Sequence, residues 1–484
     1  MKIFSLTQDN FELRAFEIEI SLMPGLPQIS ILGQADALVK ESIPKIQSAI
    51  KFQGFQLPKA QHILVDLKPQ YLKKNNRGLE LAIATAILLE TKQIRLRSHS
   101  KKPWLIVGNL SLKGEVVTTR DSLSQFSDLK KFEIIAGPDT KMRDAHSEIE
   151  KLRDLKCPRW VEASAFRERK KVLPKLPKLS FSKTAARLMQ ILAVGEHHCL
   201  VAGSMGSGKS TVIATIPKLI EPASELDLEQ IENIQKYFGQ HLTARPEVNV
   251  HHSISTIAFL GGGTRLHPGE ITRAHKGTLI MDEFMQFDSE IQDAMREPLE
   301  NAKLTVARSG EFVEFPADVF LLATTNLCMC GQFAMSSNRS CTCYKAKIKS
   351  YLSKLVGPCL DRFQALAFSS SWENQEKEIS TAEIYELVGH AIQFRKRERA
   401  QNLPNAKVLI EELSGWMDQK FIDDYFKLGS MSERRQIALK RVARTIADLE
   451  ASERVRIKHF NEALGLTVGS FQWLEQAQKA SASV

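Results

Sequence analysis

Two groups of residues in this sequence combine the residue types and the spacing that a chemical site requires. The first follows the apolar segment "HCLVA" and has the form G-x-x-x-x-G-K-S, ending at Ser210. Its glycines, Gly203, Gly206 and Gly208, let backbone N–H groups curl around phosphate oxygens without clashes from a Cβ atom. A helix beginning directly after them would add the partial positive charge of its N-terminus. The pattern therefore predicts a phosphate-binding loop between a strand and a helix.

The polar residues at the end of this loop have distinct expected roles. Lys209 is placed to reach the β- and γ-phosphates of ATP, and the hydroxyl of Ser210 is placed to bind Mg²⁺. Thr211 completes the predicted nucleotide-binding set in the first turn of the helix. The alternative is a glycine-rich turn before an ordinary helix, but the apolar strand in front of the loop favours the nucleotide site.

Two further apolar segments end in polar residues. The segment "GTLIMDEF" places Asp282 and Glu283 after an apolar run, and "FLLATTN" ends at Asn326. Apolar runs are typical of strands buried in a parallel sheet, whose carboxyl ends meet at the edge where ligands bind. We expect Asp282 to bind Mg²⁺, Glu283 to act as general base toward the attacking water, and Asn326 to orient that water. An ordinary strand end with an acidic helix cap is the alternative for Asp282 and Glu283.

The second group comprises four of the seven cysteines, in the segment "CMCGQFAMSSNRSCTC" directly after "FLLATTN". Two Cys-x-Cys pairs across a ten-residue loop can bring four thiolates to one tetrahedral Zn²⁺, which leaves no open position for catalysis. The loop has little apolar content of its own, so a structural metal would replace the missing core. The alternative is four free thiols, kept reduced in the cytosol. The candidate zinc ligands are Cys328, Cys330, Cys341 and Cys343.

The elements that must position these residues indicate an α/β fold followed by a helical region. Near the start, "FELRAFEIEISL" alternates as a half-buried strand does, and "ALVKESIPKIQSAIKF" and "LELAIATAILLETKQI" have helical patterns. The segment "VLPKLPKLSFS" is typical of a linker because prolines disfavour helix and lysines favour solvent. The predicted division is an α/β domain (1–166), a basic linker (167–181), a nucleotide-binding core (182–372) with a cysteine insertion (328–343), and a helical domain (373–484).

Composition and charge narrow the class of protein. The net charge of +10 over 484 residues permits a nucleic-acid partner without requiring one, and the basic runs are equally explained as solvated faces. Seven cysteines, an odd number, argue against a disulfide framework. The N-terminus lacks an apolar signal region, and "LAIATAILL" is far shorter than the roughly 20 residues of a membrane span. We therefore expect a cytoplasmic protein without a membrane segment.

Several longer segments resemble the magnesium-chelatase-like ComM/YifB family of AAA+ ATPases. The resemblance rests on "RPEVNVHHSISTIAFLGGGTRLHPGEITRAHKGTLIMDE", "REPLENAKLTVARSGEFVEFPADVFLLATTN", the paired cysteines, "GPCLDRF", "RVARTIADLE" and, near the N-terminus, "GLPQISILGQADALVKES". It implies a Lon-protease-like N-terminal α/β domain, an AAA+ P-loop core and a C-terminal helical lid. The stretch comparable with the Lon nucleophile, "NRGLELAIATA", contains no serine, so we expect no protease activity. Met205 stands where the family typically has proline.

The resemblance also implies roles for two arginines. Arg362 in "LDRF" matches the arginine finger, which enters the site of a neighbouring subunit and neutralises charge on the γ-phosphate. Arg434 in "SERRQ" matches the sensor-2 arginine of the lid, although Arg435 beside it is the alternative. Both could instead be surface arginines. An arginine finger that acts across subunits implies a homo-oligomeric ring, a hexamer.

The segment "AKLTVARSGEFVEFP" alternates around Ser309 and Gly310 and predicts a β-hairpin. In rings of this family such a hairpin points into the pore. Lys303, Arg308 and Arg265 would then contact a DNA backbone. A stabilising surface hairpin is the alternative.

The resemblance implies an ATP-hydrolysing ring motor acting on DNA, specifically a branch-migration helicase in recombination or natural transformation. Its cofactors would be ATP, Mg²⁺ and one structural Zn²⁺. A chelatase-type ATPase that remodels a protein partner in metal insertion is the alternative. A nucleotide-binding adaptor without turnover is disfavoured, because the residues for hydrolysis are all present.

Overall fold

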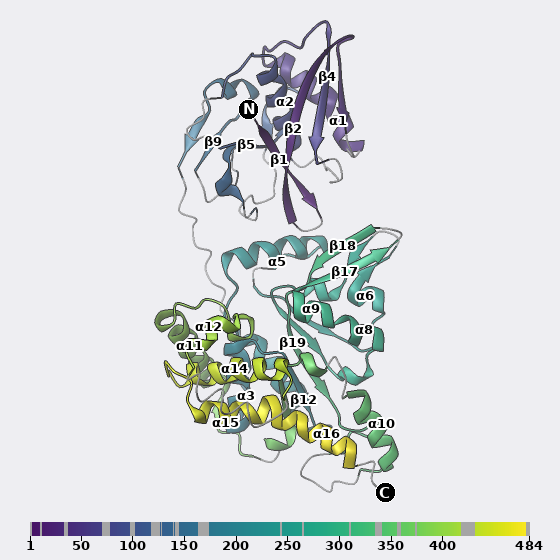
Figure 1. Cartoon of the computed structure of the whole chain (residues 1–484), viewed down its shortest axis with the longest axis vertical. Helices are drawn as coiled ribbons and strands as arrows, with labels where there is room; N and C mark the ends of the chain where they lie inside the picture. Colours follow the sequence, from purple (N-terminus) through teal and green to yellow (C-terminus); the bar gives the residue numbers. More distant parts are fainter. Residues whose placement is uncertain are drawn as a thin grey trace. The chain divides into compact units, whose positions relative to one another are not determined.

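The computed structural model describes most of the chain, in two compact units that are treated separately, Met1–Lys170 and Lys171–Val484 (Figure 1). The described residues are 2–9, 12–32, 37–69, 78–96, 102–117, 126, 128–138, 140, 145–162, 174–242, 244–263, 266–308, 311–333, 341–355, 360–372, 375–417 and 431–480.

The first unit is built on an eight-stranded mixed sheet with the strand order β10-β9-β8-β5-β1-β2-β4-β3. Strands β1, β2 and β4 pair antiparallel, whereas β5 and β8 run parallel to β1. The strands are β1 (Ile3–Asp9), β2 (Glu12–Pro24), β3 (Gln28–Leu32), β4 (Gln61–Lys68), β5 (Trp104–Val107), β8 (Glu133–Ala136), β9 (His146–Glu148) and β10 (Arg159–Val161), with a separate pair β6 (Asn109–Leu110) and β7 (Val116–Val117).

Two helices accompany this sheet, and both were predicted from the sequence, although the second ends at Glu90 and not at Ile94 as predicted. They are α1 (Ala37–Phe52) and α2 (Leu79–Glu90). Every residue of α2 from Leu79 to Leu88 is buried, which is typical of a helix that is apolar on all sides. It packs against β1, β2 and β5, so it forms the centre of the core of this unit.

The second unit contains a five-stranded parallel sheet with the order β13-β16-β19-β12-β20. Its strands are β13 (Glu247–Val250), β16 (Thr278–Met281), β19 (Phe320–Thr325), β12 (Cys199–Ala202) and β20 (Ala365–Phe368). Every residue of the last four is buried, which explains why they are apolar runs in the sequence. The α/β fold with a parallel sheet is therefore confirmed.

Helices surround this sheet and fill the rest of the second unit. In chain order they are α3 (Lys183–Gly195), α4 (Lys209–Thr215), α5 (Glu225–Tyr237), α6 (Thr256–Leu260), α7 (Glu270–Arg273), α8 (Ser289–Ala294), α9 (Arg296–Asn301), α10 (Lys345–Leu355), α11 (Thr381–Glu398), α12 (Ile410–Ser414), α14 (Glu433–Leu449), α15 (Ile457–Leu464) and α16 (Ser470–Ala480), with a π-helical turn at Gly465–Gly469 and short 3-10 helices η6 (Leu360–Arg362) and η8 (Asn405–Lys407).

Alternate residues of strand β12 face two different cores. Leu200 and Ala202 join a cluster with side chains from α6, α7, α8, α10 and α16. Cys199 and Val201 join another with side chains from α3, α4 and α11. Because successive side chains of a strand point to opposite faces, the sheet is covered by helices on both sides.

The C-terminal part of the chain is helical, as predicted. Helix α11 begins with a capping box, in which Ser380 and Glu383 satisfy each other's backbone N–H groups. Helix α14 packs against α3, α11 and α15, and these helices lie together in Figure 1. Within the described ranges, none of the helices combines the length and the apolar content that a membrane crossing requires.

The predicted hairpin is present as β17 (Lys303–Arg308) and β18 (Glu311–Pro316), which pair antiparallel. On it, Lys303 Nζ lies 2.6 Å from Glu314 Oε1. The predicted turn residues Ser309 and Gly310 lie outside the described residues, as does Arg265. A smaller pair, β14 (Gly261–Gly262) and β15 (His267–Pro268), precedes α7, and another joins β11 (Ser180–Phe181) to β21 (Ile379–Ser380).

Candidate nucleotide-binding site and metal centre

The predicted phosphate loop connects the carboxyl end of β12 to the start of α4. Gly206 and Gly208 have φ angles of 77° and 83°, in the left-handed region that favours glycine. The N–H of Gly203 donates to the carbonyl oxygen of Thr325 at 3.1 Å. From the other side, the indole Nε1 of Trp372 donates to the carbonyl oxygen of Ser207 at 3.2 Å. The loop is thus anchored to the neighbouring strand β19 and to a tryptophan that carried no recognisable signal in the sequence.

Lys209 is buried inside this loop. Its Nζ donates to the carbonyl oxygens of Gly203 at 3.0 Å and Ser204 at 2.6 Å. The same Nζ lies 3.3 Å from Oδ1 of Asn326, at the end of β19. The structure therefore brings these two predicted site residues together, and a phosphate oxygen would offer the ammonium group a charged acceptor in the same place.

A second corner of the site joins α4 to the end of β16. Ser210 Oγ lies 3.3 Å from Oδ1 and 3.2 Å from Oδ2 of Asp282. The hydroxyl of Thr324 donates to Asp282 and accepts the backbone N–H of Glu283 at 3.1 Å. A hydroxyl and a carboxylate are the oxygen ligands that Mg²⁺ prefers, so this pair fits the ion. Thr211 is exposed on the same turn, and its carbonyl accepts a hydrogen bond from Thr215.

The sequence-based prediction missed Thr324. The parallel register aligns Ala323 with Met281, so Thr324 and Asp282 extend the same ladder by one residue. The signal that could have identified Thr324 is its polar side chain near the end of an otherwise apolar strand.

Glu283 has an unusual backbone conformation for a non-glycine residue, with φ 55° and ψ 49°. Such a conformation costs about 1 kcal/mol and needs support from its surroundings, which the bond to Thr324 supplies. Its side chain is 39% exposed and lines an open pocket of about 390 Å³, together with Asp282 and residues 249–252. Nδ1 of His252, which follows β13, lies 3.8 Å from Glu283 Oε2. His252 is a neighbour of the predicted base that the sequence did not identify as such.

Arg362 lies at the opposite edge of the sheet from the phosphate loop. It ends η6, three residues before β20, and the first residue of β20, Ala365, pairs with Cys199 at the start of β12. The loop follows the other end of β12, at the carboxyl edge. Nη2 of Arg362 lies 3.0 Å from Oε1 of Glu300, and the Arg362 side chain is only 11% exposed.

Arg434 lies beside Arg362, and its Nη2 contacts the same oxygen of Glu300 at 2.6 Å. Its neighbour Arg435 is packed differently: its guanidinium donates to the carbonyl oxygens of Phe363 at 3.0 Å and Leu360 at 3.1 Å. That guanidinium also lies 3.3 Å from the ring centroid of Phe471, and burial lowers the pKa of Arg435 to about 10. The two adjacent arginines therefore differ, since Arg435 is part of the packing and Arg434 is half-exposed.

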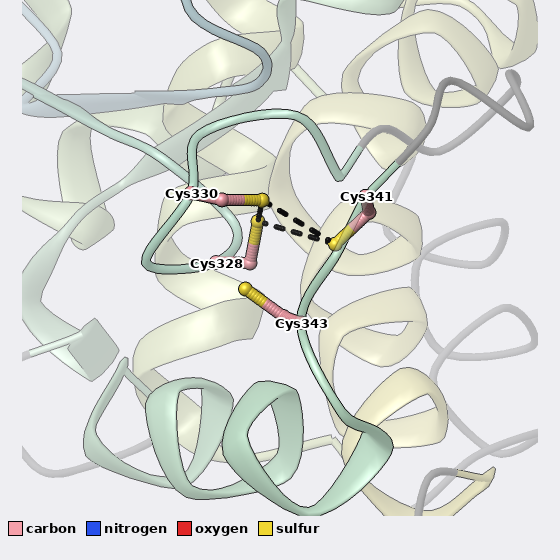
Figure 2. A group of neighbouring side chains, drawn as sticks. All are labelled: Cys328, Cys330, Cys341 and Cys343. Carbon is pink, nitrogen blue, oxygen red and sulfur yellow. Dashed lines mark hydrogen bonds between the residues drawn. The ribbon is translucent and has the colours of Figure 1, made fainter.

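The four cysteines of the insertion converge, as Figure 2 shows. Cys328 and Cys330 follow β19, Cys341 and Cys343 precede α10, and their side chains point toward one another. The four sulfurs lie within 4.8 Å of one another. The Cys328–Cys330, Cys330–Cys341 and Cys328–Cys341 sulfur pairs are 3.3, 3.5 and 3.7 Å apart, and the thiols are free. Residues 334–340 between the pairs lie outside the described residues.

This geometry fits a tetrahedral zinc ion. Zn–S bonds of about 2.3 Å place the four sulfurs of a tetrahedron about 3.8 Å apart, close to the observed separations. The N–H of Phe333 donates to Cys328 Sγ at 3.3 Å. A hydrogen bond from the backbone of Gln332 is the main cause that lowers the pKa of Cys330 to about 6. This donor stabilises the Cys330 thiolate, the form that binds metal, whereas burial raises the pKa of Cys328 and raises that of Cys341 to about 12.

Comparison with protein families covers most of the chain. The family described as "Magnesium chelatase, subunit ChlI" matches residues 176–377, "Subunit ChlI of Mg-chelatase" matches residues 18–138, and "Magnesium chelatase, subunit ChlI C-terminal" matches residues 378–467.

Individual relatives align along nearly their whole length. The chain is 28% identical to "Uncharacterized protein YifB" of Salmonella typhimurium and 29% identical to the protein of that name in Escherichia coli, in both cases over 92% of this chain and 93% of the relative. It is 27% identical to "Competence protein ComM" of Haemophilus influenzae over 93% of both chains. The chain belongs to the magnesium-chelatase-like family of the ComM and YifB proteins.

Proposed function

We propose that this chain is an AAA+ ATPase that hydrolyses ATP at the loop Gly203–Ser210. The observation that carries the proposal is the buried ammonium group of Lys209, held between the loop carbonyls and Asn326 at the carboxyl edge of the sheet. Lys209 binds the β- and γ-phosphates, and the backbone N–H groups of the loop cradle them. Ser210 and Asp282 would hold Mg²⁺, which neutralises charge on the phosphates.

The hydrolytic step in this proposal uses Glu283 and Asn326. Glu283 accepts the proton of the attacking water, and the Asn326 amide orients that water. The support is geometric: the bond from Glu283 N–H to Thr324 fixes the base next to Asp282, and the open pocket in front of it admits water. His252, 3.8 Å from the carboxylate, is placed to hold it in position.

We further propose that Arg362 and Arg434 complete the site of a neighbouring copy in a ring, a homohexamer. A residue at the amino edge of the sheet is separated from its own phosphate loop by the length of β12, so it is better placed to serve another subunit. The shared contact with Glu300 supports a common role for the two arginines. A cation supplied across the interface would link hydrolysis to assembly.

The four cysteines are proposed as the ligands of one structural Zn²⁺. The sulfur separations, the free thiols and the backbone donors at Cys328 and Cys330 support this assignment. A site with four thiolates is closed, so the ion would stabilise the segment after β19 and take no part in hydrolysis.

The proposed substrate of the ring is DNA, with branch migration as the activity. The name of the Haemophilus influenzae relative refers to competence, and the net charge of this chain is +10. The hairpin β17–β18 carries Lys303 and Arg308, which could contact phosphates. The chelatase-type alternative is a motor that remodels a protein partner in metal insertion, and the descriptions of the matching families favour it.

ATP hydrolysis measured with and without four-way DNA over a range of salt concentrations distinguishes the two functions. Strong stimulation that fades with salt is expected for a DNA motor, because phosphate contacts release counterions. Hydrolysis that is indifferent to DNA would favour the chelatase-type activity. A Lys209→Ala variant, which lacks the phosphate-binding ammonium group, provides the blank for contaminating ATPases.

The domain assignments are part of the same proposal. We propose that 1–166 is a Lon-like domain without protease residues, that 182–372 is the ATPase core after a linker at 167–181, and that 373–484 forms a helical lid. At the start of α2, where a Lon serine would be expected, an ion pair joins the buried Glu80 to the partly exposed Lys45 at 2.9 Å. That pair supports a scaffold role for the first unit, and the cytoplasmic location stays a prediction.

A further inference from the structure

A hydrogen bond connects the cysteine cluster directly to the phosphate loop. The backbone N–H of Met205, inside the loop, donates to the carbonyl oxygen of Gly331 at 2.8 Å. Gly331 immediately follows Cys330. The metal centre and the nucleotide site are therefore joined by one bond between main-chain groups, although Met205 and Gly331 are more than a hundred residues apart in the sequence.

The conformation of Gly331 brings this carbonyl to the loop. Its φ angle is 72°, which favours glycine, and its N–H closes a turn by donating to the carbonyl oxygen of Cys328 at 3.1 Å. A Cβ atom at this position would lie 3.3 Å from both Cβ and Cε of Met205. The turn that carries the first two thiols is thus packed closely against the loop.

A second connection runs through β19. Asn326, which accepts from Lys209, is separated from Cys328 by Leu327 alone, and both Leu327 and Cys328 are buried. The first pair of cysteines therefore borders the nucleotide site on two sides. It contacts the loop through Gly331, and it lies two residues beyond Asn326, which directly follows β19.

We propose that the metal-loaded cysteine cluster positions the phosphate loop, so that nucleotide affinity depends on zinc occupancy. This inference rests on the proposed nucleotide site and zinc site. Among residues 328–333 and 341–343, the apolar side chains that pack against the core are those of Phe333 and the four cysteines themselves, so loss of the metal releases the turn at Gly331. The Met205 N–H then loses its acceptor, and the phosphate loop is less ordered before nucleotide binds. Nucleotide binding must then order the loop, which weakens the affinity for nucleotide.

The coupling is reciprocal, because two ligands that bind one protein affect each other's affinity by the same factor. If zinc strengthens nucleotide binding, nucleotide must strengthen zinc binding equally. This second effect can be measured without any catalytic activity.

The test measures the affinity of the full-length protein for a fluorescent ATP analogue with excess Mg²⁺. The measurement is made on the protein as purified, after zinc is removed, and after zinc is restored. Met205→Pro removes the backbone N–H, and Met205→Ala is the matched control that keeps it. For wild type and Met205→Ala, we expect zinc removal to weaken binding about tenfold, the effect of one net hydrogen bond, and zinc addition to restore it. Met205→Pro, which carries the residue typical of the family, has no N–H to lose, so we expect its affinity to change less than about twofold on zinc removal.

The possible outcomes distinguish failure of the coupling from failure of the zinc site or of the nucleotide site. Wild-type affinity that is unchanged by zinc removal overturns the coupling alone. An equal loss in Met205→Pro and wild type indicates general loosening and overturns the role of this bond. Absence of bound zinc in the purified protein overturns the metal centre, and absence of nucleotide binding by the zinc-loaded protein overturns the ATPase as well.

A measurement on unmodified protein covers the possibility that Met205→Pro does not fold. Zinc transfer to a chromogenic chelator is followed with and without the ATP analogue, and circular dichroism monitors folding in each state. We expect saturating analogue to lower the equilibrium constant for zinc transfer by the same factor as zinc changes nucleotide affinity. Identical transfer in both conditions overturns the proposal.

Discussion

At the scale of single residues, the hydroxyl of Thr324 organises the hydrolytic corner of the site. It donates to the Asp282 carboxylate and accepts the N–H of Glu283, so one side chain orients the proposed magnesium ligand and the proposed base. Since Glu283 adopts a left-handed backbone conformation, loss of this support would affect the position of the base directly.

Replacing Thr324 with Val should reduce ATP turnover about tenfold to a hundredfold, because two hydrogen bonds worth about 1–3 kcal/mol are lost at nearly constant volume. The matched control is Thr278→Val on β16, which is also fully buried and whose hydroxyl has no hydrogen-bond partner among the described residues. Steady-state turnover and thermal unfolding of both variants test this. Equal effects of the two substitutions would mean that Thr324 has only a packing role.

Replacing Glu283 with Gln should lower turnover by about 10²- to 10⁴-fold, because an amide cannot accept the proton of the attacking water. Nucleotide affinity should remain within about threefold of wild type, since the phosphates bind to the loop. Titration with a fluorescent ATP analogue and a phosphate-release assay separate the two effects. Glu290→Gln on the exposed side of α8 is the control, and undiminished turnover in Glu283→Gln would exclude Glu283 as the base.

At the scale of elements, the carboxyl and amino edges of the parallel sheet carry different parts of the proposed chemistry. The loop, Asp282 and Asn326 follow the carboxyl ends of β12, β16 and β19. The two arginines lie at the other edge, where α14 and η6 meet α9. Adjacent residues at the start of α14 consequently have different surroundings.

Replacing Arg435 with Ala should lower the free energy of unfolding by about 2 kcal/mol or more, because its bonds to the carbonyl groups of Leu360 and Phe363 and its contact with Phe471 are lost. Replacing Arg434 with Ala should cost less than about 1 kcal/mol, since exposed ion pairs contribute little, but should reduce turnover. Chemical denaturation and ATPase assays on both variants check this. The reverse pattern would assign the sensor role to Arg435.

At the scale of the whole second unit, buried histidines make the fold sensitive to acid. Nδ1 of His275 accepts the N–H of Asp318 at 3.0 Å, and Nδ1 of His198 accepts the N–H of Leu321 at 3.2 Å, so both rings must be neutral. Burial lowers the pKa of each to about 4, and that of His197 to about 3. Although burial alone would raise the pKa of Asp318, Lys407 and Lys276 hold it below its ordinary value.

The free energy of unfolding should therefore fall as the pH drops from about 6.5 toward 4. In this range the histidines of the unfolded chain bind protons, whereas the buried histidines of the folded chain stay neutral. Each histidine contributes roughly 1–3 kcal/mol over that window. Replacing His275 with Gln should flatten the dependence, whereas the exposed control His241→Gln should leave it unchanged. Urea titrations between pH 7.5 and 5 measure the free energy of unfolding of wild type and both variants. The prediction is contradicted if this free energy depends on pH with the same slope in all three proteins.

Assembly into a ring predicts that two inactive variants regain ATP turnover when they are mixed in one ring. Arg362→Ala and Glu283→Gln should each be inactive alone, yet a random equal mixture should recover up to about a quarter of the wild-type turnover, because some sites then combine an intact base with a neighbour's arginine. Turnover of the mixture relative to each variant is the measurement. No recovery in rings shown to contain both variants would indicate that Arg362 serves its own subunit.

Much of the nucleotide site could be predicted from the sequence because it consists of local patterns. The glycines and Lys209 are close together in the chain, and Asp282 and Asn326 each directly follow a strand whose burial on both faces requires an apolar run. The cysteine quartet is likewise a local pattern, since the two pairs flank a single short loop. Chain order alone brings such residues to one sheet edge once the strands are parallel.

Contacts between distant segments were decided only by the tertiary structure. Packing against Phe471 separates Arg435 from Arg434, parallel register sets Thr324 beside Asp282, and a left-handed glycine aims its carbonyl at Met205. No pattern within a segment encodes these pairs, because each depends on how helices and strands far apart in the chain pack together. The sequence by itself determined which groups are available for chemistry, and the packing of the second unit determined which of them meet.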